Sequence, residues 1–133
     1  MMNEDLVASL QALRSDPAIV VTLYRQLFDA TLIVLVDDAR VNLQDIGFLA
    51  YPTGDRTHEI PVFTSPERPL LRRLESENGA TRLEIKGHDL WSRLLDLVVS
   101  DDCEVAVDPG ELHSIAINRE LLLGIVKTRG IVA

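Results

Sequence analysis

The chain has 133 residues, of which 47% are hydrophobic and 26% charged. This length favours one domain over residues 1–133, and a domain of this size buries enough surface to fold without disulfides or a metal. Thirteen basic residues against twenty-one acidic ones give a net charge of −8. Phosphate groups and anionic lipids repel such a surface, so nucleic acid and membranes are not expected partners.

The N-terminal region and the single cysteine indicate where the protein works. Residues 1–14 include Glu4 and Asp5 and lack the basic and apolar regions of a signal peptide. The longest apolar run, around residues 31–36, is far shorter than the ~20 residues of a membrane-spanning helix. Cys103 is the only cysteine and excludes an intrachain disulfide. We therefore expect a cytoplasmic protein.

Two helices are predicted before the first strand. Asn3 is the expected cap of the first helix, and Asp16 followed by Pro17 is typical of a second helix start. The apolar positions recur at helical spacing, as Leu6, Leu10 and Leu13 and then as Val20, Leu23, Tyr24, Leu27 and Phe28.

The next segments predict three strands and a short helix. Residues 31–36 are continuous, apolar and rich in β-branched side chains, which is typical of a strand buried on both faces. Residues 46–51 and 58–63 flank a turn that contains Gly54, so they predict a hairpin. Ser65 is the expected cap of the short helix that follows.

The second half alternates strands and helices. Its expected elements are a strand over residues 81–86, a helix over 87–98, a hairpin of strands over 103–107 and 112–117, and a last helix over 120–127 capped by Asn118. The whole order is ααβββαβαββα, which indicates an α+β domain with a mixed sheet covered by helices. We expect residues 32–36 to be the middle strand of that sheet, under helices that carry Leu23, Leu27, Trp91 and Leu95.

Three stretches carry a family resemblance. They are Leu-Tyr-Arg-Gln-Leu-Phe-Asp-Ala-Thr-Leu at 23–32, Ile-Pro-Val-Phe-Thr-Ser-Pro-Glu-Arg at 60–68, and Val-Ala-Val-Asp-Pro-Gly at 105–110. The chain resembles the N-terminal domain of the SseB (enhanced serine sensitivity) family, with the domain core at about residues 5–126. The turn that is typically Asn-Pro in that family is Asp108-Pro109 here. The resemblance implies a bacterial cytoplasmic protein and brings no catalytic residues or cofactor with it.

No residue pattern identifies a catalytic or metal site. Ser65 lacks the Gly-x-Ser-x-Gly elbow of hydrolases, and the acidic neighbours of Cys103 disfavour a reactive thiolate. His88 follows a single glycine, which is a weak signal for phosphate binding. His113 lies near several acids, but the cadence of a calcium loop is absent. We expect no cofactor and no metal.

The charge pattern is the remaining clue. Residues 96–111 contain six acids and no lysine or arginine. Such an edge suits docking of a basic protein, although it also serves solubility. The proposed edge consists of Asp96, Asp101, Asp102, Glu104, Asp108 and Glu111. Two hypotheses follow. The first is a non-catalytic protein-interaction or regulatory module, whose partner is another protein or a second copy of the chain in a homo-oligomer. The second is an enzyme or small-molecule sensor whose site is assembled from sequence-distant residues.

Overall fold

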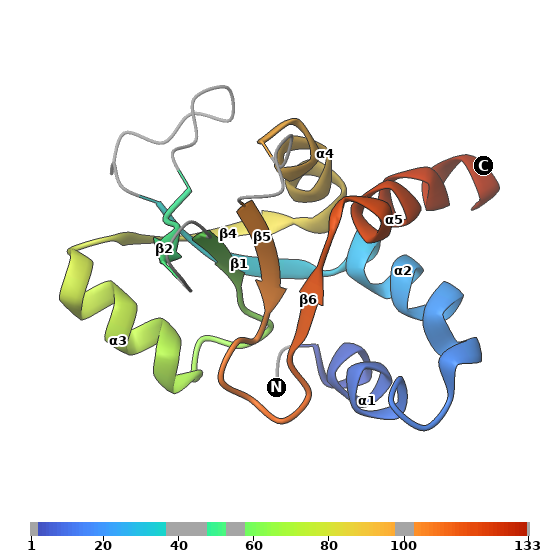
Figure 1. The fold of residues 1–133 in the computed structure, drawn as a ribbon, viewed down its shortest axis with the longest axis horizontal. Helices are drawn as coiled ribbons and strands as arrows, with labels where there is room; N and C mark the ends of the chain where they lie inside the picture. Colours follow the sequence, from blue (N-terminus) through green and yellow to red (C-terminus); the bar gives the residue numbers. More distant parts are fainter. Residues whose placement is uncertain (1–2, 37–47, 53–57, 98–102, 133) are drawn as a thin grey trace.

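The computed structural model describes residues 3–36, 48–52, 58–97 and 103–132. Its elements are α1 (Glu4–Ala12), the 3-10 helix η1 (Pro17–Ile19), α2 (Val20–Asp29), β1 (Thr31–Val36), β2 (Tyr51–Pro52), β3 (His58–Val62), α3 (Pro69–Asn78), β4 (Thr81–Lys86), α4 (Gly87–Leu97), β5 (Cys103–Val107), β6 (Ile115–Ile117) and α5 (Arg119–Val132). Apart from the short η1, the predicted order and the α+β class are confirmed (Figure 1). None of the helices in the described ranges combines the length and apolarity that a membrane span requires.

The strands form two sheets. β1 and β4 are antiparallel, and the other sheet has the order β2-β3-β5-β6, in which only β3 and β5 are parallel. Two isolated bridges connect β1 to segments that flank the other sheet. Ile33 and Phe63, next to β3, exchange backbone hydrogen bonds of 2.9 and 2.8 Å, and Val36 is bridged to Phe48, ahead of β2. The prediction of one sheet centred on residues 32–36 was therefore wrong in part. β3 aligns with β5 along its length, so it touches β1 only at its end.

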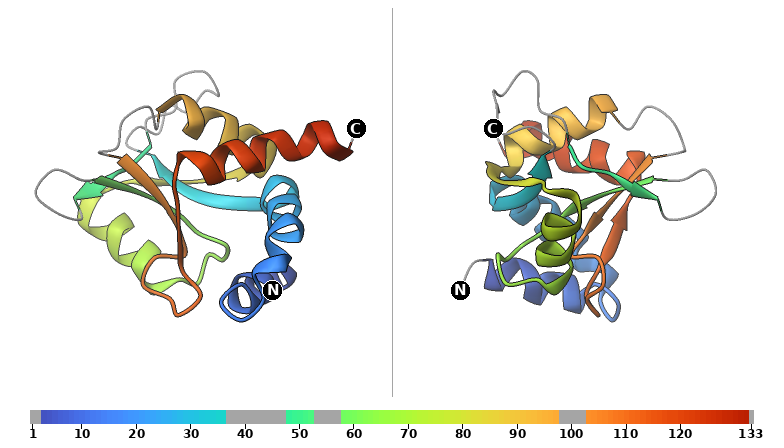
Figure 2. Two further views of the ribbon diagram at one scale, coloured as in Figure 1. Left: turned by 45° about the vertical axis from the view of Figure 1, so that its right-hand side comes forward. Right: turned by 90° about the vertical axis from the view of Figure 1, so that its left-hand side faces the viewer.

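β1 separates two hydrophobic clusters. Leu32, Val34 and Val36 belong to the main cluster, which β3, β5 and β6 share with helices α1, α2, α4 and α5. Ile33 and Leu35 point the other way, into a smaller cluster closed by α3. Figure 2 (left) shows α4 and α5 above β1 and α3 below it. Every β1 residue from 32 to 36 is at most 1% exposed, so the predicted burial on both faces is confirmed.

The packing of α4 against α2 depends on a glycine. The Gly87 backbone N–H donates to the Ala30 carbonyl at 2.7 Å, and a Cβ on Gly87 would lie 2.0 Å from the Leu27 carbonyl oxygen. One turn later, the Trp91 indole N–H donates to the same Leu27 oxygen at 2.7 Å. Trp91 is fully buried, so this bond satisfies the polar atom of the largest core side chain. Trp91, Leu23 and Leu27 lie in the main cluster and Leu95 packs against it, as predicted.

The predicted helix caps have mixed outcomes. Asp16 accepts a hydrogen bond from the Ala18 N–H at 3.2 Å and Asn118 from the Leu121 N–H at 2.9 Å, so both caps are confirmed. Ser65 accepts from the Glu67 N–H at 3.3 Å, but this turn precedes α3, which begins at Pro69. Asn3 occupies the N-cap position of α1, as predicted, but its side chain does not cap the helix.

The Asn3 side chain is used elsewhere. Its backbone is left-handed, with φ 63°, and the side chain makes no capping bond to α1. The amide instead donates to the carbonyls of Thr31 at 2.8 Å and Thr64 at 3.0 Å. Asn3 thus joins the start of α1 to the start of β1 and to the segment after β3.

Candidate functional site

A buried carboxylate organises the end of the four-stranded sheet. Asp108 directly follows β5, has a left-handed backbone with φ 49° and is 0% exposed. Its N–H donates to the Val62 carbonyl at 2.8 Å, and its carbonyl accepts from the Glu111 N–H at 3.1 Å. The first bond extends the β3–β5 pairing, and the second closes the turn that leads to β6. Aspartate tolerates this left-handed conformation better than most residues.

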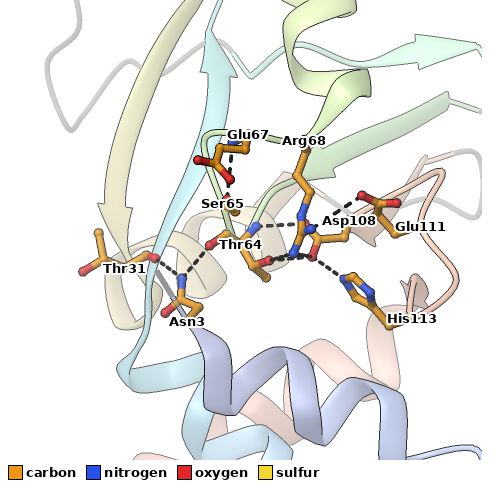
Figure 3. Close-up of polar contacts among 9 residues, drawn as sticks. All are labelled: Asn3, Thr31, Thr64, Ser65, Glu67, Arg68, Asp108, Glu111 and His113. Carbon is orange, nitrogen blue, oxygen red and sulfur yellow. Dashed lines mark hydrogen bonds and ion pairs between the residues drawn. The ribbon is translucent and has the colours of Figure 1, made fainter. Parts of the chain in front are cut away.

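The carboxylate of Asp108 is surrounded by three residues from two segments (Figure 3). Thr64 donates its N–H at 2.8 Å to one oxygen and its hydroxyl at 2.5 Å to the other. The Nε2 atom of His113 lies 2.6 Å from that second oxygen, and an Arg68 guanidinium nitrogen lies 3.2 Å from it. Arg68 also donates to the Thr64 hydroxyl at 3.0 Å and faces Glu111 at 3.5 Å. We call Thr64, Arg68, Asp108 and His113 the Asp108 cluster.

The Asp108 cluster is not arranged for nucleophilic catalysis. In a hydrolase triad the imidazole lies between the hydroxyl and the carboxylate, so that it takes the hydroxyl proton. Here the carboxylate lies between Thr64 and His113, and both contact the same oxygen. Thr64 is also 0% exposed, so no substrate reaches it. The cluster instead fixes the segment before α3 against the loop between β5 and β6.

A groove lies next to this cluster. It has a volume of about 620 Å³ and lies between the start of α3, one face of the four-stranded sheet and the loop that follows β5. It is lined by Tyr51, Glu59, Arg68, Pro69, Leu70, Arg73, Ala106, Pro109, Gly110, Glu111, Ser114 and Ala116. These residues come from β2, β3, the start of α3, β5, the loop after β5 and β6, so only the folded chain brings them together.

The floor of the groove follows from strand alternation. Ile60, Val105 and Ile117 point into the main cluster, so the residues next to them along each strand lie on the opposite face of the sheet, which is the face that bears the groove. Strand register places these neighbours in two rows across the sheet. One row is Tyr51, Glu59 and Glu104, and the other is Pro61, Ala106 and Ala116. The second row has only small or compact side chains, which is why the sheet face is hollow there.

The charged row is partly fixed by a hydrogen bond. The Tyr51 hydroxyl donates to a carboxylate oxygen of Glu59 across the β2–β3 pair. Burial, followed by this hydrogen bond, raises the pKa of Tyr51 well above its usual range. Glu104 lies beside Glu59 in the register and is exposed. Two carboxylates therefore lie side by side on this sheet face, that of Glu59 in the groove lining and that of Glu104 next to it.

The acidic residues predicted to form an exposed edge differ in their exposure. Glu104 is exposed and is paired with Glu59 in the strand register, and Glu111 is partly exposed and lines the groove. Asp108 is completely buried and paired with Arg68, so its predicted place on an exposed edge was wrong. Its contacts with Thr64 and Arg68 were not predicted, because these residues are distant from Asp108 in sequence. Asp101, Asp102 and the side chain of Asp96 lie outside the described residues.

The other candidate residues do not converge on the groove. His88 is about half exposed, its Nδ1 atom lies 3.3 Å from a carboxylate oxygen of Asp89, and its ring lies against that of Phe28. His58 is exposed at the start of β3. Cys103 begins β5. Within the described ranges, no three His, Cys, Asp or Glu side chains are grouped as metal ligands would be.

The structure thus defines an α+β domain with two hydrophobic clusters, a buried ion-pair cluster and an adjoining surface groove. Residues 6–123 match the family described as the SseB protein N-terminal domain. The match covers most of the 133 residues, so the chain belongs to this family and the predicted resemblance is confirmed. The comparisons with curated proteins and with solved structures gave no match.

Proposed function

We propose that this domain is a non-catalytic protein-interaction module of the bacterial cytoplasm, and that it holds a segment of a partner protein in the groove described above. The observation that carries the proposal is the hollow face of the four-stranded sheet. Its floor contains Ala106 and Ala116, and α3 and the loop after β5 form its walls. A sheet face bordered by raised elements offers both apolar contact and polar groups at the rim, as interfaces require.

The Asp108 cluster supports binding because it holds both walls in place. Arg68 begins the α3 wall, and His113 belongs to the opposite loop. Both contact the same buried carboxylate oxygen. A groove whose walls are fixed before binding requires less ordering when the partner arrives.

The polar groups of the groove favour docking over chemistry. Arg68 is engaged by Asp108 and Glu111, and the Tyr51 hydroxyl is engaged by Glu59. A general base or nucleophile must instead be within reach of a substrate proton or carbon. Because these side chains already have partners within the domain, they are better suited to contact a bound segment than to react with a substrate.

A pair of tryptophan variants tests this proposal. Ala116→Trp places a large side chain on the groove floor, at an exposed position of β6. Val21→Trp is the matched control, because Val21 is an apolar residue of α2 that is 52% exposed. Both variants and the unmodified protein are used to capture partners from the native cell, with melting temperatures measured in parallel.

The expected result is that Ala116→Trp loses a partner that Val21→Trp retains, while both variants melt close to the unmodified protein. The proposal is wrong if the groove variant, folded, captures the same proteins in the same amounts as its control.

A further inference from the structure

Resting on the proposed function, we infer that the groove accepts an extended partner segment in which an apolar residue and a lysine or arginine lie two positions apart. The apolar side chain would lie over Ala106 and Ala116. The basic side chain would lie between Glu59 and Glu104.

The spacing of the two rows supports this motif. Glu104 and Ala106 are two residues apart on β5, and the register aligns Glu59 and Pro61 with them on β3. The rows are therefore separated by about 6.6 Å, from a rise of about 3.3 Å per strand residue. Side chains i and i+2 of an extended peptide face the same way and have the same separation. A segment that runs along the strands thus presents one side chain to each row.

The charge of the first row favours a cation. Like charges on neighbouring strands destabilise a sheet, and Glu59 and Glu104 are such neighbours. In the described residues no lysine, arginine or histidine forms an ion pair with either of them. A basic side chain placed between them would relieve the repulsion. The net charge of −8 adds long-range attraction for the same partner.

The two arginines of the groove do not cancel this preference. Arg68 is neutralised by Asp108 and Glu111, at 3.2 and 3.5 Å. Arg73 is 66% exposed on α3 and faces Glu77 at 3.8 Å. Both belong to the α3 wall, whereas the two carboxylates belong to the sheet.

The test is an NMR titration of the whole chain with three synthetic peptides. The first contains Leu-Ser-Lys between Gly-Ser flanks. The second contains Leu-Lys-Ser, which has the same composition and charge but places the two side chains on opposite faces of an extended chain. The third contains Leu-Ser-Glu. Amide signals of Ala106 and Ala116 report where each peptide binds.

The first peptide should bind most tightly and shift the two alanine signals. Its binding should weaken as the salt concentration rises, since screening reduces attraction between exposed charges. Glu104→Gln should weaken it by about fivefold, the upper end for one exposed charge pair. The matched control Glu84→Gln changes an exposed glutamate on β4 and should leave the affinity unchanged.

Three results would overturn the inference: equal binding of the first two peptides, tighter binding of the acidic peptide, or no effect of Glu104→Gln. If no peptide binds but Ala116→Trp still loses its partner, the motif is wrong and the proposed function stands. If Ala116→Trp keeps every partner, the proposed function itself fails.

Discussion

Removing the cation of the Asp108 cluster gives the sharpest test of what holds the groove together. Arg68→Met keeps much of the aliphatic stem but leaves the carboxylate of Asp108, 0% exposed, without its guanidinium partner. Breaking a buried ion pair from one side typically costs about 3–5 kcal/mol. Because the Arg68 side chain is 21% exposed and Asp108 keeps its bonds to Thr64 and His113, we expect a loss of about 2–4 kcal/mol in the free energy of unfolding.

The matched control is Arg73→Met, five residues along the same region. Arg73 is 66% exposed, and its contact with Glu77 is 3.8 Å long, so its loss should cost less than about 0.5 kcal/mol. Urea unfolding followed by circular dichroism measures both variants, and the Arg68 variant should also melt roughly 10–15 °C lower. The reasoning is refuted if the two variants have equal stability.

A double variant separates charge from packing. Asp108→Asn removes the buried charge, and asparagine also tolerates the left-handed backbone at φ 49°. Added to Arg68→Met, it should therefore restore part of the lost stability, because no uncompensated carboxylate remains. Additive losses would show that Arg68 acts through its stem and not through its charge.

Two further predictions concern other parts of the fold. Gly87→Ala should cost at least about 2 kcal/mol in urea unfolding, because the added Cβ would lie 2.0 Å from a backbone oxygen. Gly124→Ala is its control and should cost less, since its Cβ would meet the movable ring of Tyr24 at 2.9 Å; equal costs would contradict the reasoning. Tyr51 has a raised pKa, so its protonated form is favoured in the folded state. This stabilisation is complete below pH ~10, the ordinary pKa of tyrosine, and is lost as pH rises above it. The free energy of unfolding of Tyr51→Phe should fall less steeply between pH 10 and 12 than that of the unmodified protein. An unchanged slope in that range would exclude Tyr51 as the cause of the loss of stability.

Local patterns predicted the fold better than they predicted the site. The continuous apolar run at residues 31–36 indicated burial on both faces because it has no polar alternation, and the structure confirms it. The division into two sheets was not predictable in this way. It depends on whether β3 aligns with β5 or with β1, and pairing of strands distant in sequence leaves no local pattern. The predicted side-chain cap at Asn3 was wrong for a similar reason, because the partners of that side chain, Thr31 and Thr64, are distant in sequence.

The acidic stretch shows why composition alone cannot tell an exposed carboxylate from a buried one. Glu104 and Asp108 belong to one run of acids, yet the first is exposed and the second is fully buried. Strand alternation could have placed Glu104 on the face opposite Val105. Nothing local could have placed Arg68 beside Asp108, forty residues away, because that contact requires the parallel pairing of β3 and β5. The same pairing brings Glu59 beside Glu104. One tertiary feature therefore buries the Asp108 carboxylate of the predicted edge and places the Glu59 carboxylate of β3 beside Glu104.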